Sequence, residues 1–199
     1  MNTKAITAGS ITQTSGTGTT TFDGAINTNN STGVNLTGNN FTFNQAVTGT
    51  NNGAVTINSI GNVNTKAITA GSITQTSGTG TTIFDGAINT NNTTGINLAG
   101  NNFTFNQAVT TTNNGGVSIN NSGNLIINSA ADFNLDGAFT QSGTGAVSLA
   151  GDIITSNDNI TFSSLLTLTG TVLLNPGIGN LSFSTLNAGG QSLTLKAGE

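Results

Sequence analysis

Apolar and polar residues alternate over short stretches along the whole chain. In Phe41-Thr42-Phe43 and in Leu193-Thr194-Leu195, apolar side chains stand two positions apart, which is the period of a strand with one buried face. The segments between such stretches, for example 28–33 and 48–53, are rich in Asn, Gly, Ser and Thr. These residues are typical of turns. The pattern therefore predicts an all-β chain and disfavours helices.

The chain contains a long repeat built from a shorter one. Residues 2–63 and 64–125 align without a gap, and 52 of the 62 aligned positions are identical. Within each repeat, apolar residues recur at a step of about 21 residues. One column at this step contains Phe22, Phe43, Val63, Phe84, Phe105 and Ile127. A second column contains Ile26, Val47, Ala67, Ile88, Val109 and Ala131. We interpret the long repeat as three coils of about 21 residues each.

The divergent part, residues 126–199, keeps the same step. Ile160, Phe162, Val172 and Leu174 are followed one step later by Leu181, Phe183, Leu193 and Leu195. Like residues that recur at a fixed step predict a right-handed parallel β-helix (β-solenoid), because each coil then stacks on the previous one at about 4.8 Å. We expect roughly nine coils in one unit over residues 1–199. An antiparallel sandwich would also show alternating apolar and polar residues, but it would not require like residues to recur at a fixed step.

Composition excludes most catalytic chemistry. Only 5% of the residues are charged, the net charge is −4, and Cys, His, Trp, Tyr and Arg are absent. A Ser-His-Asp or Cys-His nucleophile and a His or Cys metal site therefore have no residues to form them. Three lysines form no basic patch for nucleic acid or an anionic membrane surface, and no apolar run reaches membrane-spanning length. The sequence predicts a non-enzyme without catalytic residues, metal ligands or cofactor.

Two acidic residues occupy equivalent positions and are candidates for a catalytic pair. Asp23 and Asp85 would stand three coils apart, at about 14 Å, beyond the separation of cooperating glycosidase carboxylates. The position that follows the first apolar column contains Asp23, Asn44, Asn64, Asp85, Asn106 and Asn128. We therefore predict an Asn/Asp ladder whose side chains bond along the stack.

One segment matches the first half of a calcium-binding loop. Asp132, Asn134, Asp136 and Gly137 fit the spacing D-x-N-x-D-G, but position twelve is Gly143 where such a loop has Glu. The apolar residues between them alternate as in a strand. We expect an outward-facing polar row, with a weak surface cation as the alternative.

Other motifs follow from composition. Threonine is abundant, but Thr12 and Thr14 are followed one step later by Gly33 and Asn35, so no Thr-x-Thr array for binding ice is predicted. Glycines 16 and 18, and 78 and 80, precede no helix and no lysine at phosphate-loop spacing. Asn-x-Ser/Thr triplets, which permit glycosylation, begin at Asn30, Asn40, Asn92, Asn102 and Asn159.

The ends of the chain have no features of their own. Residues 1–4 lead directly into the repeat without the charged head and apolar run of a signal peptide. The last residues, 197–199, show no sign of a finished domain. We expect the chain to be an excised fragment of a longer protein.

Several units resemble the β-strand repeats of filamentous-haemagglutinin-like proteins. They are residues 38–48 and 100–110 (Gly-Asn-Asn-Phe-Thr-Phe-Asn-Gln-Ala-Val-Thr), 145–153 and 179–198. That family comprises very large bacterial surface or secreted adhesins, exported by two-partner or autotransporter routes. The resemblance implies a β-helical shaft that presents a binding region, and a location at the cell surface or outside the cell.

Three functions are consistent with these observations. The first is a structural shaft segment of such an adhesin, which would reach glycans or proteins of host or neighbouring cells through the parent protein. The second is self-assembly into fibres by end-to-end stacking, since a solenoid has open strand edges at its two ends. The third is a carbohydrate-binding or carbohydrate-active β-helix, which the missing Arg and His and the scattered carboxylates disfavour.

Overall fold

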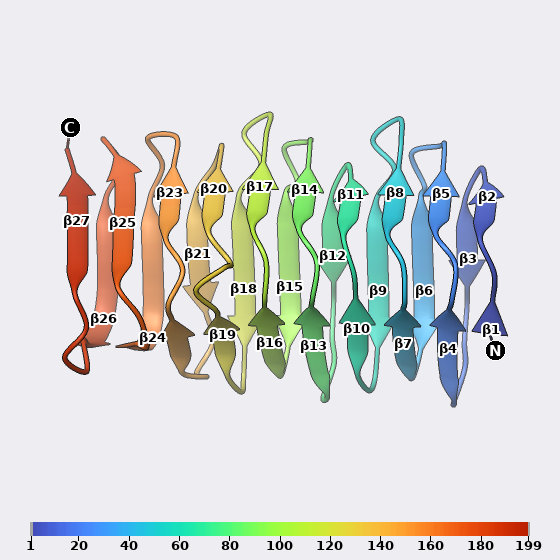
Figure 1. Ribbon diagram of the computed structural model, residues 1–199, viewed down its shortest axis with the longest axis horizontal. Helices are drawn as coiled ribbons and strands as arrows, with labels where there is room; N and C mark the ends of the chain where they lie inside the picture. Colours follow the sequence, from blue (N-terminus) through green and yellow to red (C-terminus); the bar gives the residue numbers. More distant parts are fainter. Residues whose placement is uncertain (1, 199) are drawn as a thin grey trace.

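The chain winds into a single right-handed parallel β-solenoid. The computed structural model describes residues 2–198, over which it contains strands and turns but no helix. Figure 1 shows the coils side by side along a rod, with the two termini at opposite ends. Strands nearer the viewer run upward and those behind run downward while the chain advances from N to C, which makes the winding right-handed. The predicted fold class, with about 21 residues per coil and roughly nine coils, is confirmed.

Each coil contributes one strand to each of three faces. The first face contains β1 (Asn2–Thr3), β4 (Thr19–Phe22), β7 (Asn40–Phe43), β10 (Val63–Thr65), β13 (Thr81–Phe84), β16 (Asn102–Phe105), β19 (Leu125–Ile127) and β22 (Val147–Leu149). The second face contains β2 (Ile6–Ala8), β5 (Ile26–Thr28), β8 (Val47–Gly49), β11 (Ile68–Ala70), β14 (Ile88–Thr90), β17 (Val109–Thr111), β20 (Phe133–Leu135), β23 (Ile153–Thr155), β25 (Val172–Gly177) and β27 (Leu193–Ala197).

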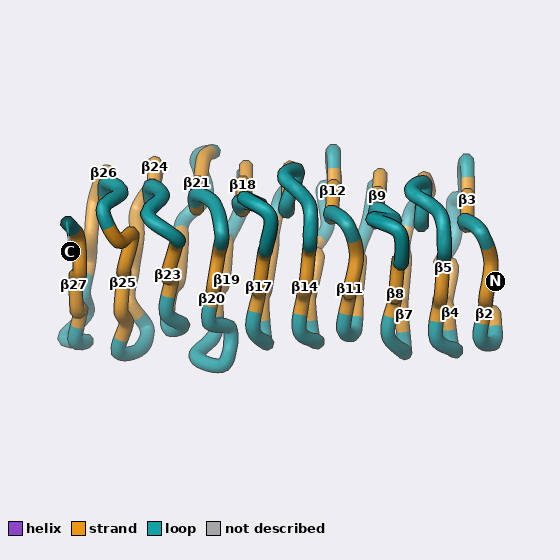
Figure 2. The backbone as a smooth tube through the Cα atoms, turned by 90° about the horizontal axis from the view of Figure 1, so that it is seen from above, coloured by secondary structure: helices purple, strands orange, loops and turns teal. Residues whose placement is uncertain are grey.

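The third face contains β3 (Ile11–Gln13), β6 (Val34–Gly38), β9 (Val55–Ser59), β12 (Ile73–Gln75), β15 (Ile96–Gly100), β18 (Val117–Asn121) and β21 (Phe139–Ser142). Near the C-terminus, β24 (Ile160–Leu168) and β26 (Leu181–Asn187) each run from the third face of one coil to the first face of the next. The first and third faces thus belong to one 17-stranded sheet, and the second face is a 10-stranded sheet. Figure 2 shows from above how turns join the two layers of strands.

Inward side chains form a continuous core along the rod. In β6, Val34 and Leu36 are fully buried while Asn35 between them is exposed, as strand alternation requires. Phenylalanine rings stack between adjacent coils. The ring centroids of Phe22 and Phe43 lie 4.9 Å apart, close to the coil spacing. Nine of the ten phenylalanines are buried, so the aromatic surface of the chain lies almost entirely in the core.

The structure corrects the register of three positions in the predicted columns. Val63 pairs with Phe41, so Thr65 rather than Val63 follows Phe43 in the first column. Thr65 then pairs with Phe84. The step from Phe43 to Thr65 is therefore longer than the step from Thr65 to Phe84, because turns of different length separate strands that remain aligned. The constant step predicted from the sequence is the average of these unequal steps.

The second column needs the same correction. Ile68, not Ala67, pairs with Val47, and Phe133, not Ala131, pairs with Val109. The predicted pairs in the C-terminal part are confirmed, since Ile160, Phe162, Val172 and Leu174 lie opposite Leu181, Phe183, Leu193 and Leu195.

A few polar side chains lie inside the core. The Thr82 hydroxyl donates to Oε1 of buried Gln75 at 2.8 Å. Gln141 is fully buried and its Nε2 donates to Asn121 Oδ1 at 2.8 Å. By contrast, the buried hydroxyl of Thr65 has no hydrogen-bond partner, and it stands in the phenylalanine column.

Asparagine side chains in the turns bond to the neighbouring coil. Asn39 Nδ2 donates to the carbonyl of Thr17 at 2.9 Å, and Asn40 Oδ1 accepts the N–H of Asn62 at 2.8 Å. In both cases the partners lie one coil apart along the rod. The abundance of Asn is thus explained by turns whose backbone groups would otherwise lack partners.

Candidate functional site

The predicted Asn/Asp ladder exists on the surface of the first face, with one rung changed. Asn44 Nδ2 donates to Asp23 Oδ1 at 2.7 Å, and Asn106 Nδ2 donates to Asp85 Oδ1 at 2.6 Å. Asn128 Nδ2 then donates to Asn106 Oδ1 at 2.5 Å. The sequence-based prediction of Asn64 as the rung between Asn44 and Asp85 is wrong.

Lys66 occupies that rung. Since Asn64 pairs with Thr42, Asn64 belongs to the outward row of the strand and Lys66 comes opposite Asn44. Lys66 Nζ lies 3.2 Å from Asp85 Oδ2. The sequence carried a signal for this pairing, because Lys66 precedes Asp85 by the same separation at which Lys4 precedes Asp23.

The acids of the ladder do not form a catalytic pair. Asp23 and Asp85 are separated by the rungs of Asn44 and Lys66, which places them about 14 Å apart at one strand spacing per rung. The hydrogen bond from Asn106 and the nearby Lys66 ammonium hold the pKa of Asp85 below its ordinary value of 3.8, against the opposing effect of burial. A general acid needs its pKa raised, so Asp85 is suited to a structural ion pair.

The segment that resembles a calcium loop is a strand. Phe133 and Leu135 are buried in β20 while Asn134 between them is exposed. Asp132 and Asp136 flank this strand, about 13 Å apart along an extended chain, too far for one cation with ligands at about 2.4 Å. Among the described residues, no three acidic, His or Cys side chains gather to hold a metal ion.

The two flanking carboxylates bond to backbone instead. Asp132 Oδ1 accepts the N–H of Asp152 at 3.0 Å, one coil away. Asp136 Oδ2 accepts the N–H of Asn114 at 2.9 Å in the preceding coil. Both carboxylates therefore help to join coils.

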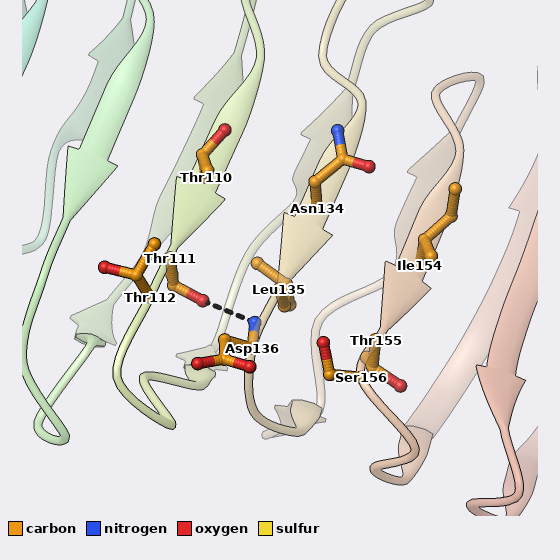
Figure 3. Close-up of a pocket in the computed structure, with 9 residues that line it drawn as sticks. All are labelled: Thr110, Thr111, Thr112, Asn134, Leu135, Asp136, Ile154, Thr155 and Ser156. Carbon is orange, nitrogen blue, oxygen red and sulfur yellow. Dashed lines mark hydrogen bonds between the residues drawn. The ribbon is translucent and has the colours of Figure 1, made fainter.

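A shallow groove crosses the second face over β17, β20 and β23 (Figure 3). Its volume is about 450 Å³, and Thr110, Asn134 and Ile154 project across it from the three strands. The Asp136 N–H donates to the Thr111 hydroxyl at 3.0 Å at one end. The lining offers hydroxyls, one amide and one carboxylate, and none of its residues is aromatic. It can make polar contacts, but it has no stacking platform for a sugar ring and no acid pair.

The corrected register also changes the threonine rows without producing an ice-binding array. Thr12 pairs with Asn35, not with Gly33. Its outward row continues through Thr56, Thr74, Asn97, Ser118, Thr140, Thr161 and Ser182. Asparagine and serine interrupt the row, so the threonines do not repeat at every coil.

The glycosylation triplets lie where asparagine has a structural role. Asn30 and Asn92 accept backbone N–H groups two positions on, from Thr32 and Thr94. The other three accept N–H groups from the next coil, namely Asn40 from Asn62, Asn102 from Asn124 and Asn159 from Asn180. Glycines 16, 18, 78 and 80 lie between strands and precede no helix.

Comparisons with known protein families, with curated proteins and with solved structures find no match for this chain. Within residues 2–198 there is no helix long and apolar enough to cross a membrane.

Proposed function

We propose that this chain is a structural β-helical shaft segment of a large bacterial surface or secreted adhesin and that it has no catalytic activity. The observation that carries the proposal is the unbroken stack: parallel pairing joins successive coils on all three faces from β1 to β27. The adhesin context and the location at or outside the cell surface come from the resemblance of the repeats to filamentous-haemagglutinin-like proteins.

The stack is suited to bearing load along the rod. Backbone hydrogen bonds between coils run parallel to the rod axis, so separating two coils breaks the bonds of three strands and the core contacts between them together. Side chains add further bonds in the same direction, such as Asn44 to Asp23 and Asn39 to Thr17. A shaft requires this continuity and needs no reactive site.

The outer surface is suited to the same role. The outward rows consist mainly of Thr, Asn and Ser, which repeat from coil to coil without the repulsion that stacked like charges would cause. In this proposal the partners of the parent protein, whether glycans or proteins of another cell, bind elsewhere on it. The chain binds no nucleic acid and inserts into no membrane.

Deleting residues 64–125 tests the shaft role. This unit begins and ends at the same point of a coil, so its removal preserves every column and shortens the rod by three coils, about 14 Å. We expect the shortened protein to fold, with the lower maximum dimension visible in small-angle X-ray scattering. Fused between an outer-membrane anchor and an epitope tag, it should also give less access to an antibody at the cell surface.

Duplication of residues 64–125 is the matched control and should increase both the rod length and the access to the tag. Saturable binding of the isolated chain to a glycan array or to host cells would contradict the proposal. Such binding would favour a carbohydrate-binding module. That module is otherwise disfavoured, because none of the phenylalanine side chains in residues 2–198 is fully exposed to bind a sugar ring.

Self-assembly into fibres is a second candidate for residues 1–199 as an isolated chain, since an excised solenoid would present open strand edges to a second copy. It predicts concentration-dependent fibres in light scattering and electron microscopy. A strictly monomeric protein at high concentration would exclude it.

A further inference from the structure

The Asn-x-Ser/Thr triplets of the chain differ in whether strands hold them. Of the ten triplets, six have at least two residues in a strand, and they begin at Asn35, Asn40, Asn102, Asn120, Asn159 and Asn180. The other four lie wholly in turns and begin at Asn29, Asn30, Asn91 and Asn92. Strand residues are held by backbone hydrogen bonds to neighbouring coils, and the middle residue of the triplet at Asn40 is Phe41, which is fully buried. Within residues 2–198, the four turn triplets alone can enter the active site of an enzyme without breaking strand pairing.

The four turn triplets occupy two equivalent turns. Residues 29–33 connect β5 to β6, and residues 91–95 connect β14 to β15. These turns correspond in the two long repeats, so they lie three coils apart, at about 14 Å. Both project from the same long edge of the rod (Figure 1). Exposed loops tolerate added groups better than packed sheets do, so a group attached at both turns would stand on one edge and leave the core unchanged.

The first turn presents one triplet that is exposed at all three positions, Asn30, Ser31 and Thr32. Asn30 Oδ1 accepts the N–H of Thr32 at 3.0 Å, and this bond holds the amide beside the third residue of its own triplet. The same oxygen accepts the N–H of Gly33 at 3.2 Å, while Asn30 Nδ2 donates to none of the described residues. The side-chain carbonyl therefore stabilises the turn and leaves the amide nitrogen available for reaction.

The second turn repeats this arrangement. Asn92 Oδ1 accepts the N–H of Thr94 at 2.9 Å, and Asn92 Nδ2 has no acceptor within residues 2–198. Asn92 is half-buried, while Thr93 and Thr94 are exposed. The chain thus presents the same asparagine, held in the same way, twice along one edge.

We propose that Asn30 and Asn92 are sites of N-linked glycosylation, with Thr32 and Thr94 as the third residues of their triplets. The donor is a sugar activated at C1 as a diphosphate ester, and a glycosyltransferase catalyses the transfer. The bond from the asparagine Nδ2 to C1 forms while the bond from C1 to the phosphate oxygen breaks. The diphosphate leaves with the electron pair, and Nδ2 loses one proton. Oδ1 takes no part, so its hydrogen bonds in the turn remain. This inference concerns a modification site and does not depend on the shaft role.

Mass spectrometry of the protein isolated from its own organism tests the two sites. Fragmentation by electron transfer keeps a glycan on its peptide and so locates the modified residue. We expect glycan at Asn30 and Asn92 at least tenfold more often than at Asn40 and Asn102, whose triplets lie in strands. The added mass distinguishes a single sugar, taken from a nucleotide donor, from a longer glycan taken from a lipid donor. Protein without glycan at both Asn30 and Asn92 would overturn the proposal, as would equal occupancy of the strand triplets.

Two variants of the full chain identify the acceptor within the first turn, using a purified N-glycosyltransferase and its nucleotide-sugar donor. Thr32→Val removes the hydroxyl of the triplet at Asn30 but keeps the backbone N–H that Asn30 accepts. It should abolish modification of this turn. Ser31→Ala is the matched control, because it disrupts only the triplet at Asn29 and should leave Asn30 modified. If Ser31→Ala abolishes the modification and Thr32→Val does not, the sugar is on Asn29 and the assignment is wrong.

Discussion

Lys66 Nζ lies 3.2 Å from Asp85 Oδ2, although the two residues stand on consecutive coils. Each outward position in a solenoid recurs about 4.8 Å along the rod, so a charged side chain always has the next coil as its neighbour. Asp85 has Lys66 on one side and Asn106 on the other. The ladder therefore tolerates a carboxylate because it places a cation and an amide donor beside it.

Replacing Asp85 with Asn should destabilise the protein at neutral pH but not at a pH low enough to protonate Asp85. The pKa of Asp85 is lowered in the folded state, so its contribution is complete above the ordinary value of 3.8 and is lost as the pH falls through the folded value. Because Lys66 and Asp85 are 51% and 40% exposed, we expect a loss below about 1 kcal/mol at pH 7. Urea unfolding at pH 7 and at pH 2 measures the difference.

A double-mutant cycle with Lys66→Gln provides the control for this ion pair. In the Lys66→Gln background, Asp85→Asn should lower the free energy of unfolding at pH 7 by less than it does in the native chain. An Asp85→Asn penalty that is the same at pH 7 and pH 2 would contradict the assignment.

Replacing Thr65 with Val should stabilise the protein. Thr65 is 1% exposed and its hydroxyl has no partner, so the substitution removes a buried polar group at nearly constant volume. We expect a gain of about 1 kcal/mol in the free energy of unfolding. Chemical denaturation compares the variant with the native chain.

Thr82→Val is the matched control on the next coil. The Thr82 hydroxyl donates to buried Gln75, so its removal leaves Oε1 of Gln75 without that donor and should cost about 1–2 kcal/mol. We therefore expect Thr65→Val to raise the free energy of unfolding and Thr82→Val to lower it. If both variants lose stability, the Thr65 hydroxyl has a partner such as a buried water.

The fold could be predicted from the sequence because every coil of a solenoid follows the same pattern. Alternating apolar and polar residues predict strands, and like residues that recur at a fixed step predict which strands lie side by side. The exact register could not be predicted, since strands align by pairing while turns vary in length. Val63 and Thr65 show the difficulty: the apolar residue fits the constant step better, but the turn before it places Thr65 in the phenylalanine column.

The candidate sites were predicted less well for the same reason. A register error of two positions replaced Lys66 with Asn64 in the ladder and so concealed the ion pair. The prediction that Asp132, Asn134 and Asp136 belong to a strand-like row was correct for Asn134 in β20, because Phe133 and Leu135 on either side of it are apolar.

Replacing Gly86 with Ala should destabilise the protein strongly. Gly86 lies in the turn between β13 and β14, where a Cβ would overlap the backbone nitrogen of Ala67 in the preceding coil. Since backbone must move to make room, we expect a loss of about 1–3 kcal/mol. Gly18→Ala is the control, because a Cβ there meets nothing within 4 Å. Thermal unfolding that is equally affected by both substitutions would contradict the close approach of these coils.

Replacing Gln141 with Leu should cost more than any surface substitution on the third face. Gln141 is 0% exposed, its Nε2 donates to Asn121 Oδ1, and its Oε1 accepts the N–H of Ser163 at 3.1 Å. The Ser164 hydroxyl donates to the same oxygen at 3.2 Å. Leucine matches the size of glutamine but leaves these partners unsatisfied.

For this network we expect a loss of about 2–3 kcal/mol in the free energy of unfolding. Gln13→Leu is the matched control: Gln13 lies on the same face in the first coil, is only half-buried, and accepts one hydroxyl from Thr20 at 2.9 Å. Its substitution should cost less than about 1 kcal/mol. Urea denaturation followed by circular dichroism compares the two variants. If Gln141→Leu is neutral, backbone pairing and apolar packing suffice to join the coils around β21 and β24, and the buried amide has no part in fixing their register.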